Sequence, residues 1–182
     1  GSGGTRRLAS PVWVNALDQG IAVVTVDYRL TSQTGQFGTV DGTPQGTLIP
    51  VVWPAQIHDC KAAVRWVRGN AARFNFNADR IGVFGSSAGG HLVAALGTMG
   101  GITSFTRAGQ SVDMEGTVGN FDNLSSRVFA VVDYFGPTDL LNMQLDVTNP
   151  DESTDHDSVN SGVSALVGAK DVGLGVGDVR AN

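Results

Sequence analysis

The pentapeptide Gly85-Ser86-Ser87-Ala88-Gly89 constrains the fold of this chain more than any other segment. A short apolar run, residues 81–84, precedes it, and a helix-like run of small and aliphatic residues follows it. A Gly-x-Ser-x-Gly motif between a strand and a helix is typical of a nucleophile elbow, a sharp turn that lifts a serine hydroxyl clear of a sheet. The turn requires small residues two positions before and after the serine. The pattern therefore predicts Ser87 as a nucleophile, with Gly85 and Gly89 as the glycines of the elbow.

Two further apolar runs indicate the kind of sheet that would carry this turn. Residues 21–27 and 128–134 are continuous and rich in β-branched side chains, which is typical of strands buried on both faces. With the strand before Ser87 they give the order strand, helix, strand, helix, strand. This order predicts a mostly parallel sheet with helices on both faces. Since reactive groups gather at the carboxyl ends of such strands, residues 27–29 and 134–136 should lie near the elbow.

The remaining elements are predicted from periodicity and turn signals. A helix should begin at Pro54 and turn an apolar stripe toward the core, made of Ile57, Cys60, Ala63, Val64, Trp66 and Val67. Cys60 should be a buried apolar side chain rather than a catalytic thiol. Three basic side chains of this helix should face solvent, namely Lys61, Arg65 and Arg68. Shorter helices are expected over residues 9–17, 140–145 and 161–167. Residues 31–51 and 97–123 should be irregular, apart from a short hairpin around residues 40–42.

The composition is that of a globular protein: 182 residues, 41% hydrophobic and 16% charged. We expect one domain over residues 1–182. No membrane span is expected, because no apolar run approaches the roughly 20 residues that one needs. Residues 1–110 carry nine Lys and Arg against five Asp and Glu, whereas residues 111–182 carry three against twelve. Without a basic stripe, nucleic acid is not an expected partner. The sequence leaves the oligomeric state and the cellular location open.

Four blocks of the sequence resemble α/β-hydrolase esterases, and most nearly the feruloyl/acetyl-xylan-esterase-like and hormone-sensitive-lipase-like branches. They are residues 26–30, 53–66, 80–92 and 131–139, within a resemblance that covers roughly residues 12 to 168. The resemblance implies an α/β-hydrolase fold, with three αβα layers around a mostly parallel sheet. It also implies hydrolysis of short acyl or aryl esters, with esters of plant polysaccharide as a narrower class. The substrate would be a small-molecule ester, and neither a metal nor an organic cofactor would be needed.

The same resemblance assigns roles around Ser87. The backbone N–H of Ala88 would stabilise the negative charge that develops on the carbonyl oxygen of the ester. Gly3 and Gly4 would be the remnant of a second oxyanion loop, or would lie just beyond it. An acid and a histidine should follow Ser87 on loops after later strands. No such segments are visible after it, so we expect a chain truncated at both ends and lacking a complete triad.

Each of the three histidines has a more ordinary explanation than catalysis. His91, one helical turn after Ser87, should have a structural role, and His58 should lie on the surface of its helix or form a hydrogen bond. His156 stands between Asp155 and Asp157, but adjacent side chains on a loop do not orient one another as a triad requires. A solvated acidic loop is favoured there over a catalytic base or a metal site.

Several alternatives are open at the level of sequence. Asp139 could be a catalytic acid, but its place before Leu140 favours a helix cap. Asp27 and Arg29 could form an ion pair at a strand end. A glycine- and serine-rich loop of an ordinary α/β protein would also match the motif around Ser87. A peptidase or amidase would share the elbow, and a hydrolase without a triad could bind ligands without turnover.

Overall fold

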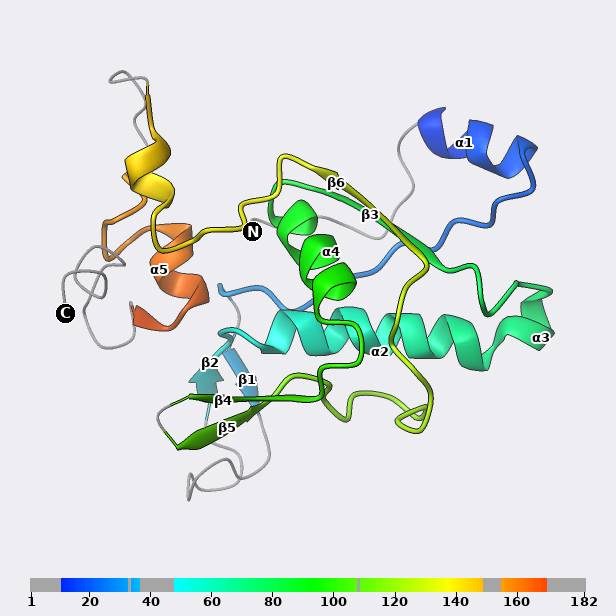
Figure 1. Cartoon of the computed structure of the whole chain (residues 1–182), viewed down its shortest axis with the longest axis horizontal. Coiled ribbons are helices and arrows are strands. Elements are labelled where there is room, and N and C mark those ends of the chain that lie inside the picture. The colour runs from blue at the N-terminus through cyan, green and yellow to red at the C-terminus, as the bar shows by residue number, and fades with distance from the viewer. Residues whose placement is uncertain (1–10, 33, 37–47, 108, 149–154, 170–182) are drawn as a thin grey trace.

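The computed structural model describes residues 11–32, 34–36, 48–107, 109–148 and 155–169 (Figure 1). Two sequence predictions fall outside these residues: the oxyanion assignment of Gly3 and Gly4, and the hairpin tip at residues 40–42. The architecture below concerns only the described parts of the chain.

A parallel pair of strands carries the Ser87 motif. β3 (Gly82–Ser86) pairs with β6 (Ala130–Tyr134), and the register places Gly82 opposite Ala130 and Ser86 opposite Tyr134. The helix α4 (Ala88–Thr98) follows β3 directly and packs across both strands. On its other side α4 contacts the long helix α2 (Ala55–Gly69), so that α4 lies between the strand pair and α2 (Figure 1). The predicted strands around Ser87 and at residues 128–134 are therefore confirmed as parallel neighbours.

One face of the β3–β6 pair packs against α4, and the other is largely exposed. Val131 packs on α4 at Gly97, where even a methyl group would collide with its side chain. On the opposite face Phe84, Val132 and Tyr134 are 47%, 47% and 51% exposed. The prediction of strands buried on both faces is thus wrong for the described residues, where α4 covers one face. A continuous apolar run indicates a strand, but it does not tell how many faces are covered.

The prediction of a strand at residues 21–27 is also wrong. Residues 21–30 form no regular secondary structure, and Ile21, Val24 and Val26 are 57%, 45% and 41% exposed. Tyr28 instead packs against the hydrophobic core from one side. A β-branched run becomes a strand only through ladder hydrogen bonds and packing, so its propensity alone does not decide the outcome.

The hydrophobic core lies between α2 and α4. It consists of Ile57, Cys60, Val64, Leu92, Ala95, Leu96 and Met114. The predicted apolar stripe of α2 is therefore confirmed in its centre, whereas Trp66 at its margin is 44% exposed. The helix begins at Ala55 with Pro54 as its N-terminal flank, one residue later than predicted. Burial, with a smaller effect of Asp59, raises the pKa of the Cys60 thiol to about 12. A thiol of that kind is protonated and inert at neutral pH, as expected of an apolar core residue.

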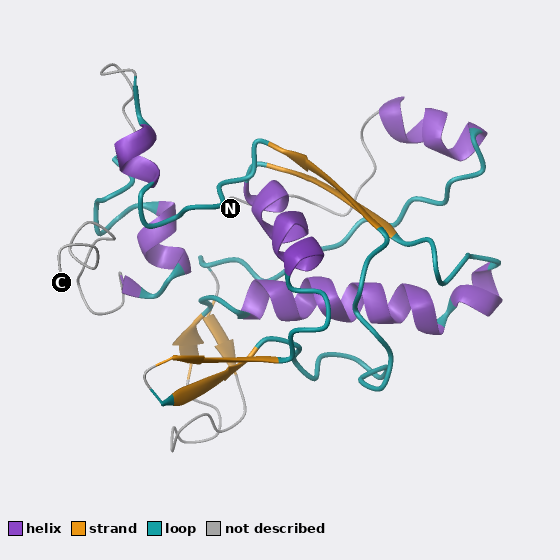
Figure 2. Cartoon of the chain, in the orientation of Figure 1, coloured by secondary structure: helices purple, strands orange, loops and turns teal. Residues whose placement is uncertain are grey.

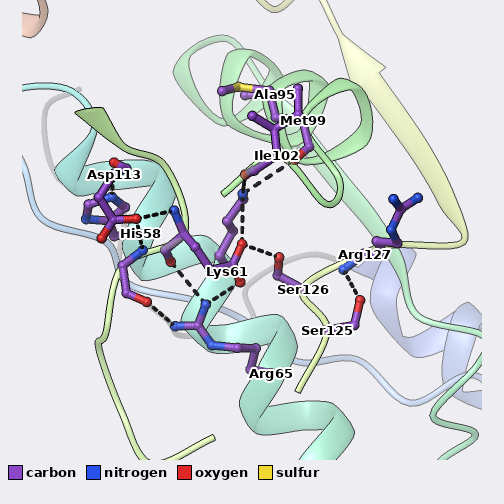
Figure 3. A network of polar contacts seen from close by, with 12 residues as sticks. His58, Lys61, Arg65, Ala95, Met99, Ile102, Asp113, Ser125, Ser126 and Arg127 are labelled. Atoms are coloured by element: carbon purple, nitrogen blue, oxygen red, sulfur yellow. Dashed lines mark hydrogen bonds and ion pairs between the residues drawn. The ribbon is translucent and has the colours of Figure 1, made fainter. Parts of the chain in front are cut away.

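Two basic residues of α2 contradict the sequence prediction. Lys61 and Arg65 were expected to face solvent, but their side chains are 0% and 1% exposed. Lys61 Nζ donates to Glu115 Oε2 at 3.0 Å and to the Ile102 carbonyl at 2.9 Å. Arg65 Nη1 donates to Glu115 Oε1 at 2.6 Å, and Ser126 donates to the same carboxylate (Figure 3). Buried cations need such partners, and Glu115 supplies them from a segment that lies 50 residues further along the chain.

Short elements surround this framework (Figure 2). Two antiparallel pairs are present, β1 (Thr34–Gln36) with β2 (Leu48–Pro50) and β4 (Ser104–Arg107) with β5 (Gln110–Asp113). The β4–β5 pair corrects the prediction that residues 97–123 are irregular. The helices are α1 (Pro11–Asp18), α3 (Ala71–Phe74), a 3-10 helix η1 (Met143–Asp146) and α5 (Gly162–Leu166). Among the described residues, none of the helices is long and apolar enough to cross a membrane.

Candidate active site

Ser87 occupies the junction between strand and helix. β3 ends at Ser86 and α4 begins at Ala88, so the strand–turn–helix arrangement that the motif predicts is present. Ser87 has φ 52° and ψ −122°, and its exposed side chain makes no hydrogen bond with the described residues. Its N–H donates to the Tyr134 carbonyl at 3.0 Å, one residue beyond the last pair of the ladder. A non-glycine residue in this region carries strain on the order of 1–3 kcal/mol, and such residues cluster at functional sites.

The two glycines of the motif have different roles. A Cβ at Gly85 would overlap the backbone of Gly89, because the first turn of α4 passes directly over the end of β3. A Cβ at Gly89 would meet no atom of the described residues within 4 Å. The sequence motif treats both positions alike, whereas the tight approach of helix and strand requires glycine only at position 85.

We expect Gly85→Ala to disrupt the elbow and Gly89→Ala to be tolerated. The added methyl at position 85 collides with backbone that cannot move without shifting α4, at a cost of roughly 3 kcal/mol. At position 89, inside a helix, alanine is favourable by up to about 1 kcal/mol. Urea unfolding of both variants measures the difference. Equal stability of the two variants would contradict the close approach described here.

The first turn of α4 also bears on the oxyanion prediction. Ala88 is the first residue of the helix, so its N–H has no acceptor within the helix. Such free amide groups at a helix N-terminus favour a negative charge nearby. The geometry is therefore compatible with the role that the sequence suggests for Ala88.

The end of β6 and the residues after it, 134–137, are held against the start of α4. Gly136 N donates to Asp133 Oδ1 at 2.9 Å, and His91 Nδ1 donates to the Pro137 carbonyl at 2.8 Å. Gly136 and Gly90 approach so closely that a Cβ on either residue would overlap the backbone of the other. Phe135, which lies between Tyr134 and Gly136 in the sequence, has φ +46°. The predicted proximity of residues 134–136 to the elbow is thus confirmed.

His91 has the structural role that the sequence predicts. Because a carbonyl oxygen only accepts, the bond to Pro137 places the ring proton on Nδ1. The ring also meets Trp53 edge-on, with centroids 5.3 Å apart, and its buried Nε2 atom has no hydrogen-bond partner among the described residues. His91 therefore ties the segment after β6 to α4.

An open pocket of about 350 Å³ adjoins Ser87. Its lining consists of Ser87, Phe135, Gly136, Pro137, Thr138, Asp139 and Met143. Asp139 accepts hydrogen bonds from the side chain and the backbone N–H of Asn142 at 2.9 and 3.2 Å, and these bonds lower its pKa. Asp139 thus closes a turn before the 3-10 helix η1. The prediction that it caps a helix beginning at Leu140 is not confirmed, because the helix begins at Met143 and Asn142 flanks its N-terminus.

The other two histidines form hydrogen bonds with other parts of the chain. His58 Nε2 bonds the Asp113 carbonyl at 2.8 Å, which fits the hydrogen-bonded alternative given above. The backbone N–H of His156 donates to the Gln144 side chain at 2.7 Å. In the described part of the chain, no group of three or more His, Cys, Asp or Glu side chains is placed to hold a metal ion.

The segment at residues 27–29 contributes a contact that the sequence did not indicate. Arg29 Nε donates to Asp59 Oδ2 at 2.9 Å, and its Nη2 donates to the Ala55 carbonyl at 3.0 Å. The ion pair between Arg29 and Asp59 thus holds this segment against the first turns of α2. Pairing with an acid 30 residues away is invisible to a search for neighbours in sequence.

Comparison with solved structures supports the fold. A bifunctional GH43-CE protein of Bacteroides eggerthii matches with a TM-score of 0.66 and 36% identity, over 85% of this chain and 17% of that chain. A truncated form of a carbohydrate esterase from gut microbiota matches with a TM-score of 0.57 and 41% identity, over 65% of this chain and 39% of that chain. Both are similar to this chain in sequence as well as in backbone.

Comparison with curated proteins finds shorter matches. An arylesterase of Saccharolobus solfataricus is 36% identical over 73 residues, or 40% of this chain. Carboxylesterase 1C of Rattus norvegicus is 40% identical over 78 residues, or 43% of this chain. The matched segments span 18% and 13% of the lengths of these two relatives.

A sequence model of one family covers most of the chain. The BD-FAE model matches residues 48–173, a range that includes the elbow, α2, α4 and the segment after β6. The match exceeds half of the chain and agrees with the structural similarity to carbohydrate esterases. The chain therefore belongs to the BD-FAE family of esterase-like α/β-hydrolases.

Proposed function

We propose that the protein hydrolyses carboxylic esters through an acyl-enzyme formed on Ser87. The observation that carries this proposal is the exposed Ser87 hydroxyl, held at a strained strand–helix junction beside an open pocket. Nucleophilic serines are presented in this way because the turn lifts the hydroxyl away from the sheet. The comparisons support an ester substrate, since the similar proteins are an arylesterase, a carboxylesterase and a carbohydrate esterase.

The proposed reaction has two steps. The Ser87 oxygen attacks the ester carbonyl while a base takes its proton, and the N–H of Ala88 stabilises the negative charge on the carbonyl oxygen. The base passes its proton to the departing alcohol. Water, which loses a proton to the same base, then attacks the acyl-enzyme, the carboxylic acid is released, and the proton returns to the Ser87 oxygen. The base is expected to be a histidine, as the resemblance to esterases implies. His91 and His58 are hydrogen-bonded to the carbonyls of Pro137 and Asp113, and none of the described contacts pairs a histidine with Ser87. No step of this chemistry requires a metal ion.

The proposed substrates are small esters with short acyl or aryl groups. Esters on plant polysaccharide form the narrower class, which is supported by the similarity to carbohydrate esterases. An amidase remains the alternative reaction of the same elbow. Rates on p-nitrophenyl acetate and p-nitroacetanilide separate the two, because the anilide is the poorer substrate of an esterase.

Labelling with a fluorophosphonate probe tests the nucleophile directly. In the full-length protein we expect the probe to modify Ser87, as identified by mass spectrometry of the peptide that contains residues 81–92. Ser86→Ala should leave labelling intact, whereas Ser87→Ala should remove it. Modification of Ser86 or of a serine elsewhere would contradict the proposal. An unlabelled protein that still binds esters would instead be the non-catalytic hydrolase considered above.

A further inference from the structure

Phe135 is exposed at a place where its backbone is held on both sides. Its side chain is 78% exposed, the largest exposed fraction among the large apolar residues of the described chain. The preceding carbonyl, of Tyr134, accepts the N–H of Ser87, and the following N–H, of Gly136, is bonded to Asp133. The aromatic ring is therefore presented from a fixed backbone rather than from a free loop.

Phe135 shares a positive φ with Ser87. The register of β3 and β6 ends at Ser86 opposite Tyr134, so Ser87 and Phe135 are the next residues on two neighbouring strands. Both have a positive φ, of 52° and 46°. A bulky residue rarely adopts this conformation, and it persists only where the surroundings enforce it. A residue with a positive φ thus exposes a hydroxyl at the end of one strand and an aromatic ring at the end of the other.

The pocket beside them has a polar and an apolar part. Phe135, Pro137 and Met143 supply the apolar lining, and Ser87 and Thr138 supply hydroxyl groups. The carboxylate in the lining, Asp139, has a lowered pKa and is negatively charged at neutral pH. An anionic ligand would be repelled here, and the lining suits a ligand that combines a reactive polar group with an apolar group.

We propose that Phe135 is a specificity-determining residue of the Ser87 site, where its ring forms a wall for a neutral aromatic group of the ester. The inference rests on the proposed function and names the substrate class of that site. Aromatic rings pair in offset or edge-to-face arrangements, which add selectivity beyond the burial of apolar area. The aromatic group can belong to the acyl part or to the alcohol part of the ester, and the experiment distinguishes them.

Two substitutions separate the ring from the backbone. Phe135→Asn removes the ring but tolerates a positive φ, because asparagine adopts this conformation more readily than other non-glycine residues. Phe135→Tyr keeps the ring. We expect the melting temperature of both variants to stay close to that of the unaltered protein, and fluorophosphonate labelling of Ser87 to persist in both.

Three esters test whether the ring of Phe135 favours aromatic substrates. Methyl benzoate has its ring in the acyl part, phenyl acetate has it in the alcohol part, and ethyl acetate has no ring. For Phe135→Asn we expect kcat/KM on one or both ring-bearing esters to fall about three- to tenfold more than kcat/KM on ethyl acetate. Phe135→Tyr should retain the selectivity for rings. Equal losses on all three esters, or no loss on any, would overturn the proposal.

Binding of acetophenone provides a readout that does not depend on turnover. NMR titration should show a Kd about three- to tenfold weaker for Phe135→Asn, with 2-butanone as the ring-free control. If Ser87 is not labelled and no ester is hydrolysed, the proposed function fails, and a Phe135-dependent affinity for acetophenone would still support the wall. If the unaltered protein and Phe135→Asn bind acetophenone equally well, the proposed role of Phe135 is wrong, even where the esterase activity is present.

Discussion

Replacing Ser87 with alanine is expected to lower kcat/KM for p-nitrophenyl acetate by at least about 10⁴-fold in the full-length protein. The substitution removes the atom that forms the acyl-enzyme, and the remaining acceleration comes only from binding and from the oxyanion donor. KM should change little, because the hydroxyl acts in the transition state more than in ground-state binding. Steady-state kinetics, with active-site titration of the unaltered protein, measure the loss.

The neighbouring serine provides the matched control for this experiment. Ser86 ends β3 and shares the exposed position of Ser87, but it belongs to the strand ladder opposite Tyr134. Ser86→Ala should keep activity within a few-fold of the unaltered enzyme. Activity that survives Ser87→Ala, or that disappears in Ser86→Ala while the fold remains intact, would assign the chemistry to another residue.

Substituting Glu115 with glutamine is expected to destabilise the fold by roughly 3 kcal/mol. Its carboxylate is the shared partner of Lys61 and Arg65, whose side chains are 0% and 1% exposed. The amide that replaces it carries no negative charge, so two buried cations lose their compensation. Urea unfolding measures the effect. Asp122→Asn, which removes a charge from an exposed side chain nearby in sequence, should change stability by less than about 0.5 kcal/mol.

The same carboxylate predicts how stability depends on pH. Burial alone would raise the pKa of Glu115, but hydrogen bonds from Lys61, Ser126 and Arg65 outweigh it and leave the pKa below the ordinary value of 4.5. A lowered folded-state pKa contributes stability above the ordinary pKa, and that stability is lost as pH falls through the folded-state value. The unaltered protein should therefore lose stability below about pH 4.5 more steeply than Glu115→Gln. Parallel pH profiles of the two proteins would show that Glu115 is not coupled to buried cations.

Local sequence patterns were sufficient for the elements next to Ser87. The apolar run before the motif and the small residues after it predict β3 and α4, because strand and helix signals there come from neighbouring positions. The same holds for the core side of α2, where Ile57, Cys60 and Val64 recur at helical spacing.

Long-range partners explain where the sequence predictions failed. Lys61 and Arg65 occupy positions that a helical period assigns to solvent. Their burial depends on distant partners, above all the Glu115 carboxylate, in a segment predicted as irregular. Residues 21–27 have a strand-like composition, but a strand also requires a neighbour that completes its ladder. The positive φ of Phe135 was equally invisible, since phenylalanine gives no local signal for that conformation.

The close approach of α4 to the strand ends divides the site into residues that can vary and residues that cannot. At Gly85, Gly90 and Gly136 backbone lies directly on backbone. Even the smallest side chain, the methyl group of alanine, would therefore collide with main-chain atoms. Phe135, Thr138 and Met143 line the pocket with side chains that can be exchanged without moving the main chain. Directed evolution toward new substrates should therefore randomise these lining positions and leave the three glycines untouched, and the library loses few of its members to misfolding.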